Sequence, residues 1–76
     1  MRLEIRADPS ELASLRRRLV RCVRSAGDAA AVADDIALAS SELATNVMRY
    51  TDTDVVEIAL ERDESTWVLA AAGVGR

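Results

Sequence analysis

Glu42 and Asn46 are the residues of this sequence whose types and spacing could do chemistry. They stand one helical turn apart in the stretch SSELATNVMRY, residues 40–50. A four-residue step along an α-helix rises about 6 Å and turns only about 40°, so the two side chains share one face, with Arg49 close below them. An amide oxygen suits Mg²⁺, which keeps several waters and is completed by phosphates. The carboxylate could accept a proton as a general base, and the arginine could neutralise phosphate charge.

The helix that carries this pair is expected at about residues 28–50. Its apolar residues recur at three- and four-residue steps and predict a seam that faces the core: Val32, Ile36, Ala39, Leu43 and Val47. Because Leu43 and Val47 adjoin the polar pair, we expect the pair at the margin of the helix–sheet contact, bordering a cleft. The alternative is an exposed glutamate and an asparagine with no role in the last turns of a helix, since short motifs often occur without function.

The other segments alternate or repeat in ways that indicate a small sheet and one more helix. Residues 2–6 alternate as a half-buried strand, and residues 54–62 and 66–72 are predicted to form an antiparallel hairpin around a DES turn. The first helix begins at DPSE, where Asp8 caps and Glu11 has capping-box spacing, and it ends before Gly27. Its apolar stripe comprises Leu12, Leu15, Leu19, Cys22, Val23 and Ala26. The fold class is therefore α+β, a two-layer sandwich of two helices on a small antiparallel sheet in the order β-α-α-β-β.

Length and composition limit what the protein can be. The 76 residues predict one domain, 1–76, with a thin core and marginal stability, for which oligomerisation would compensate. No apolar run approaches the roughly 20 residues of a membrane span, and the N-terminus does not resemble a signal peptide, so we expect a cytoplasmic protein that does not bind membranes. The absence of histidine and the single cysteine, Cys22, exclude the usual zinc sites, histidine catalysis and a disulfide framework.

Charge is divided unevenly along the chain. Residues 1–27 hold seven arginines and three acidic residues, whereas residues 28–76 hold three arginines and ten acidic residues. The arginines of the first helix are either a solvated face or a contact surface for an acidic protein. Nucleic acid is not expected as a partner, because the rest of the chain is acidic and no aromatic residue is interleaved for base stacking.

Two stretches together resemble a known family. LASSELATNVMRY, followed by a strand pair that ends in AAGVG, is similar to the N-box and the beginning of the G1 box of the histidine-kinase-like (GHKL) ATPase superfamily. The closest likeness is to the anti-sigma factor serine/threonine kinase branch. The resemblance implies an ATP- and Mg²⁺-binding transferase that regulates transcription, with a sigma factor or an anti-anti-sigma protein as partner. By position, Glu42 matches the general base, Asn46 the metal ligand, and Gly73 and Gly75 the G1 glycines, while Arg49 is placed to meet phosphate.

The sequence departs from that family at two points. Ala71 stands where the G1 aspartate would accept a hydrogen bond from adenine. The sequence stops at Arg76, before a second glycine-rich box or an ATP lid, so the domain is expected to be a truncated one that matches the N-terminal half of the family's fold. Three interpretations stay open: a kinase of an anti-anti-sigma partner, a non-catalytic protein-binding module, and a degenerate fragment. Gly73 and Gly75 are either a phosphate-approach turn or a frayed tail.

The last strand, TWVLAAA, predicts self-association. It is uncharged from Thr66 to Gly75, and as an edge strand it would present unpaired backbone groups to a second copy. We therefore expect a homo-oligomer, in the simplest case a two-fold dimer.

Overall fold

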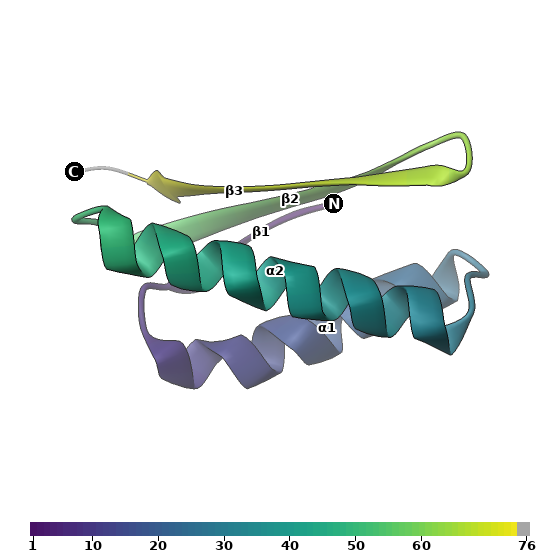
Figure 1. Cartoon of the computed structure of the whole chain (residues 1–76), viewed down its shortest axis with the longest axis horizontal. Coiled ribbons are helices and arrows are strands. Elements are labelled where there is room, and N and C mark those ends of the chain that lie inside the picture. Colours follow the sequence, from purple (N-terminus) through teal and green to yellow (C-terminus); the bar gives the residue numbers. More distant parts are fainter. Residues whose placement is uncertain (75–76) are drawn as a thin grey trace.

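The computed structural model describes residues 1–74 and has the expected α+β architecture. The chain runs through β1 (Arg2–Arg6), α1 (Leu12–Ser25), α2 (Ala30–Tyr50), β2 (Val55–Asp63) and β3 (Thr66–Val74). Figure 1 shows the three strands as one layer and the two helices on one side of it. The predicted order β-α-α-β-β and the predicted hairpin are both confirmed.

The sheet is antiparallel throughout, with the strand order β1-β2-β3. β1 pairs with β2 so that Leu3 lies opposite Ile58, and β2 pairs with β3 so that Leu60 lies opposite Leu69. Alternate residues of each strand therefore point toward the helices, as the period of two predicted. The hairpin closes between Asp63 and Thr66, where Glu64 adopts a φ of 57° in the left-handed region. β3 is an edge strand of this three-stranded sheet.

The first helix begins differently from the sequence prediction. Asp8 accepts a hydrogen bond from the backbone N–H of Ser10 at 3.0 Å, but it caps a short 3-10 turn, Pro9–Glu11, that leads into α1. Glu11 makes no capping bond and instead accepts from Nε of Arg6 at 3.1 Å. The end of the helix is as predicted, because Gly27 has a φ of 97°, a conformation that glycine adopts without the steric cost of a Cβ.

The predicted apolar stripe of α1 is largely confirmed. Leu15, Leu19 and Val23 are fully buried, and Leu12 and Cys22 pack partly buried against the core. Ala26 is exposed, because it lies beyond the last residue of the helix.

The predicted core seam of α2 is wrong by one residue. The helix begins at Ala30, and its buried face is formed by Ala33, Ala37, Ser40, Ser41 and Ala44. Val32 and Leu43 are 39% and 36% exposed, Ala39 is exposed, and only Ile36 and Val47 of the predicted seam pack partly buried against the core.

Small side chains explain why this face of α2 is the buried one. Alanine and serine allow the neighbouring α1 and the sheet to approach closely, which larger side chains would prevent. The hydroxyl of Ser40 donates to the backbone carbonyl of Ala37 at 2.7 Å, so its burial leaves no unpaired polar group.

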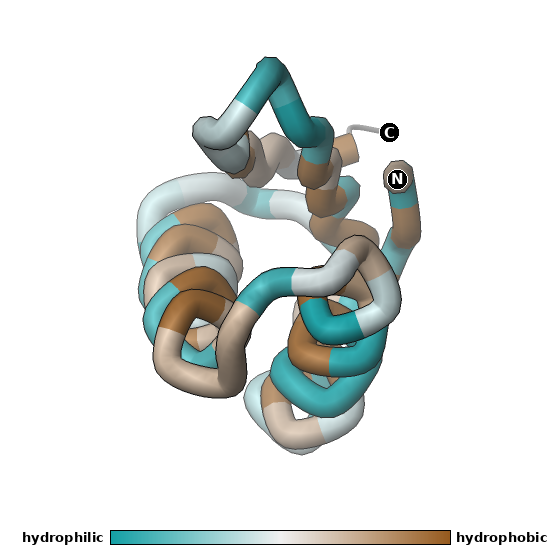
Figure 2. The backbone as a smooth tube through the Cα atoms, turned by 90° about the vertical axis from the view of Figure 1, so that its right-hand side faces the viewer, coloured by the Kyte–Doolittle hydropathy of each residue, from teal (hydrophilic) through white to brown (hydrophobic). Residues whose placement is uncertain are grey.

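One core joins the two layers. It is built from residues of both helices and of β1 and β2: Leu3, Ile5, Leu15, Leu19, Val23, Ala33, Ala44, Val56, Ile58 and Leu60. Trp67, Leu69 and Ala71 of β3 pack partly buried against it. Figure 2 shows the two helices side by side below the sheet, with the hydrophobic residues of α1 on one part of its circumference.

The end of the hairpin is tied to the loop between the helices. Nε1 of Trp67 donates to a carboxylate oxygen of Asp28 at 2.6 Å, and Arg62 pairs with the same carboxylate at 3.3 Å. The guanidinium of Arg62 also lies 5.5 Å from the centre of a Trp67 ring. Asp28 therefore does not begin α2, as the sequence suggested, but anchors the hairpin.

Neither helix of residues 1–74 is both long enough and apolar enough to cross a membrane.

Candidate functional site

Glu42 and Asn46 lie together on the outer surface of α2. Both side chains are exposed, and they line a shallow hollow of about 470 Å³ between the second half of α2 and the start of α1. Leu12 and Arg16 form the α1 side of this hollow. Glu42 and Asn46 thus share one face of α2, as predicted. They are exposed beside α1, however, and not at the margin between the helix and the sheet, where the sequence placed them.

The helix itself leaves these two side chains available. Ser41 and Thr45, which also line the hollow, donate their hydroxyls to backbone carbonyls of the preceding turn, at 3.0 and 2.7 Å. Such bonds are common for hydroxyl residues inside helices and occupy their only proton. Glu42 and Asn46 make no side-chain hydrogen bond within residues 1–74, so their oxygens are free to meet a ligand.

Arg16 takes the place in the hollow that the sequence suggested for Arg49. Arg49 is exposed at the end of α2, where its guanidinium lies 5.7 Å from the centre of the Tyr50 ring. Arg16 reaches the hollow from α1, and within residues 1–74 it has no ion-pair partner. Arg16 and Asn46 line the same hollow because α1 packs against α2. The spacing of residues within one helix could not predict this neighbourhood.

The glycine-rich end of β3 is not brought to this hollow. Gly73 lies against the segment that follows α2, where a Cβ on Gly73 would be only 3.1 Å from Cβ of Thr53. Thr53 donates to the backbone carbonyl of Val74 at 3.0 Å, so this contact ties the end of β3 to the α2–β2 connection. The glycine at 73 is explained by this close packing. Gly75 lies outside the described residues.

The side chains that line this hollow suit the metal and the phosphates of Mg²⁺-ATP better than they suit its adenine. Residues 1–74 contain no group of three or more acidic, histidine or cysteine side chains that would form a protein-only metal site. Mg²⁺ does not need one, because one or two oxygen ligands suffice when phosphates and waters complete its octahedron. Asn46 would supply one such oxygen, which leaves the carboxylate of Glu42 free to accept a proton. Ala71, in contrast, is half-buried opposite Ile58 and offers adenine no acceptor.

Comparisons of this chain with protein-family models, with curated proteins and with solved structures gave no match.

Proposed function

We propose that this chain is a regulatory protein similar to the anti-sigma factor kinases, one that binds a protein partner and presents Glu42 and Asn46 to Mg²⁺-ATP. One observation carries the proposal: a carboxylate, an amide and an arginine line the same hollow. These are the three side-chain types that phosphoryl transfer uses to take a proton, hold a metal and neutralise charge.

Each residue of the hollow has a separate role in this proposal. The side-chain oxygen of Asn46 would bind Mg²⁺, and Arg16 would donate hydrogen bonds to phosphate oxygens. The carboxylate of Glu42 would accept the proton of a serine or threonine hydroxyl of the partner protein as that hydroxyl attacks the γ-phosphorus. ATP, when bound, would supply the γ-phosphoryl group and leave as ADP. Since the hollow is open, the partner protein itself has to exclude water from it.

A phosphorylation assay tests the role of Glu42. With labelled ATP and a candidate anti-anti-sigma protein, Glu42→Gln should abolish transfer of label, because glutamine cannot take the proton. Asp35→Asn is the matched control, since it removes an exposed carboxylate of the same helix that does not line the hollow. Equal transfer by the wild type and Glu42→Gln would contradict the role of Glu42 as the base.

Ala71 favours a second candidate, a protein-binding module without turnover. An adenine amino group buried without an acceptor costs about 1–3 kcal/mol, which is about one to two decades of affinity. Ala71→Asp should therefore tighten nucleotide binding. An unchanged, measurable affinity in this variant would show that adenine does not bind near β3.

The oligomeric state belongs to the same proposal. We propose that two copies associate through the outer edge of β3, which has no neighbouring strand within residues 1–74 and carries no charged side chain from Thr66 to Val74. An uncharged edge strand is a template for pairing with another chain.

A further inference from the structure

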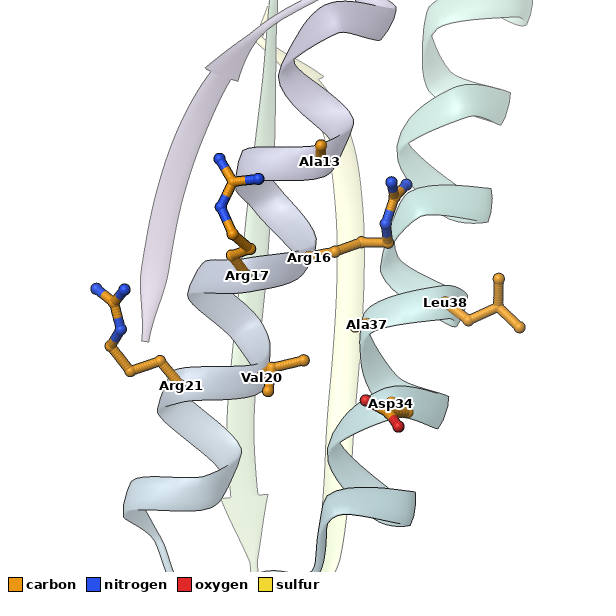
Figure 3. A pocket seen from close by; sticks show the side chains of 8 residues that line it. All are labelled: Ala13, Arg16, Arg17, Val20, Arg21, Asp34, Ala37 and Leu38. Atoms are coloured by element: carbon orange, nitrogen blue, oxygen red, sulfur yellow. The ribbon is translucent and has the colours of Figure 1, made fainter.

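A second hollow lies beside the one that holds Glu42, between the middle of α1 and the first half of α2. It has a volume of about 580 Å³ and adjoins the first hollow at Arg16, which lines both. Figure 3 shows it from close by, with Arg16 extending from α1 toward α2 and Val20 pointing in the same direction. We call this hollow the interhelical groove.

The floor of the interhelical groove is apolar and made of short side chains. Ala13 and Val20 line it from α1, and Ala37 lines it from α2. Leu38, at the outer margin, is 57% exposed. Small residues between two helices allow a third helix to approach closely, and a leucine at the margin offers it an apolar contact.

The α1 side of the groove is cationic. Arg17 and Arg21, one helical turn apart, line the groove and extend from α1 to the side away from α2 in Figure 3. Neither they nor Arg16 has an ion-pair partner within residues 1–74. On the α2 side the charge is reversed, because Asp34 lines that rim.

We infer that the interhelical groove binds an acidic amphipathic helix of a protein partner. The inference rests on the proposed function, for which it names the docking surface and the chemistry of the partner. The apolar stripe of that helix packs on Val20, Ala37 and Leu38. Carboxylates at i and i+4 on one flank match the one-turn spacing of Arg17 and Arg21, and a basic residue on the other flank meets Asp34.

This arrangement also explains how a partner would reach the candidate site. The two hollows share Arg16. A partner helix bound in the interhelical groove would therefore place the partner residues next to that helix close to Glu42 and Asn46. The partner then supplies the cover that the open hollow needs. An apolar floor with a charged rim is the usual composition of a specific protein interface.

The test uses a designed probe, a fluorescein-labelled synthetic peptide of about 18 residues, stapled because unsupported helices of that length are marginal in water. The probe carries leucines on one face and glutamates at i and i+4 on one flank, and its binding is followed by fluorescence anisotropy. A second peptide of the same composition, with its order scrambled to remove the apolar stripe, serves as the control ligand. The scrambled peptide should bind at least about tenfold more weakly.

Two neighbouring arginines provide matched protein variants. Arg17→Glu and Arg18→Glu make the same charge change at adjacent exposed positions of α1, but only Arg17 lines the groove. Arg17→Glu should weaken probe binding about tenfold, and Arg18→Glu by less than about threefold, because only the first places a like charge against the glutamates. Leu38→Ser, at an exposed position, should also weaken binding, which would show that the apolar contact contributes.

Three outcomes would overturn the inference. The first is an equal effect of Arg17→Glu and Arg18→Glu, which would mean general attraction to a basic helix. The second is equal affinity for the probe and its scrambled control. The third is tighter binding to single-stranded DNA or to anionic phospholipid vesicles than to the probe.

A parallel titration with Mg²⁺-ATP separates this inference from the proposed function. If the probe does not bind but Mg²⁺-ATP binds in a manner that depends on Asn46, the groove inference alone fails. If the probe binds through Arg17 and Mg²⁺-ATP does not bind, the nucleotide part of the proposed function fails.

Discussion

Replacing Asp28 by alanine should destabilise the protein, because this carboxylate holds the end of the hairpin to the α1–α2 loop. Asp28→Ala removes the acceptor of the 2.6 Å bond from Trp67 and the partner of Arg62 at 3.3 Å. A hydrogen bond to a charged group contributes about 1.5–3 kcal/mol, and a partly exposed ion pair adds less than about 1 kcal/mol. We therefore expect a loss of about 2 kcal/mol in the free energy of unfolding.

This loss is large for a domain of 76 residues. With an unfolding entropy of about 2.1 cal/mol/K per residue, 2 kcal/mol corresponds to a fall of about 12 °C in the thermal midpoint. Asp28→Asn, which keeps an oxygen for Trp67 to donate to, should lose only about half as much. Far-UV circular dichroism during thermal and urea unfolding measures both, and it does not depend on tryptophan fluorescence.

A double-mutant cycle tests the reasoning directly. In a Trp67→Phe background the indole N–H is already absent, so Asp28→Ala should cost less than about 1 kcal/mol, the share left to the Arg62 pair. If Asp28→Ala costs the same in both backgrounds, the bond between Trp67 and Asp28 does not stabilise the hairpin, and the reasoning is refuted.

Three further predictions follow from β3, Asp8 and Gly73. If the edge of β3 pairs with a second copy, the thermal midpoint should rise over a hundredfold range of protein concentration, whereas a constant midpoint and a monomer in sedimentation equilibrium would contradict it. The hydrogen bond from the backbone N–H of Ser10 lowers the pKa of Asp8. Asp8 therefore stabilises the fold at pH values above the ordinary pKa of a carboxyl group, and this contribution is lost as the pH falls through the pKa of Asp8 in the folded state. The stability difference between the wild type and Asp8→Ala should accordingly vanish in acid, and a carboxyl titration by NMR that finds no lowered pKa would oppose this. Gly73→Val should cost about 1–3 kcal/mol in urea unfolding, because its side chain meets Thr53; an unchanged midpoint would show that the contact adjusts freely.

The sequence predicts α1 and the strands well because their patterns have only one interpretation. In α1 the arginines mark the solvent face, so the leucine stripe has to face the core. In β1 and β2 the alternation of apolar and charged residues assigns the two faces of the sheet in the same way. The core positions Leu15, Leu19 and Ile58 follow directly from these patterns.

α2 contains two candidate stripes, and the sequence pattern selects the wrong one. The stripe with the larger side chains, Val32 to Val47, is rotated by one residue, or about 100°, from the alanine and serine stripe that the structure buries. Hydrophobicity favours the first, but close approach of α1 and the sheet favours the second, and that approach depends on neighbours distant in the sequence.

The same limit applies to the candidate site. Glu42 and Asn46 could be placed on one face because a single helix fixes their relation. Arg16 could not be added to them, since its position depends on how α1 packs on α2. The interhelical groove could likewise not be predicted from the sequence, because its lining residues come from two different helices.

Calorimetric titration of Mg²⁺-ATP into the wild type, Asn46→Ala and Asp35→Asn tests the central claim most directly. We expect weak, saturable binding to the wild type, with a dissociation constant of about 0.1–1 mM, since the open hollow encloses little of the nucleotide. Asp35→Asn should bind equally well, and Asn46→Ala should lose binding that depends on Mg²⁺. Absence of heat with the wild type, or equal binding by Asn46→Ala, would contradict the assignment of this hollow as a nucleotide site.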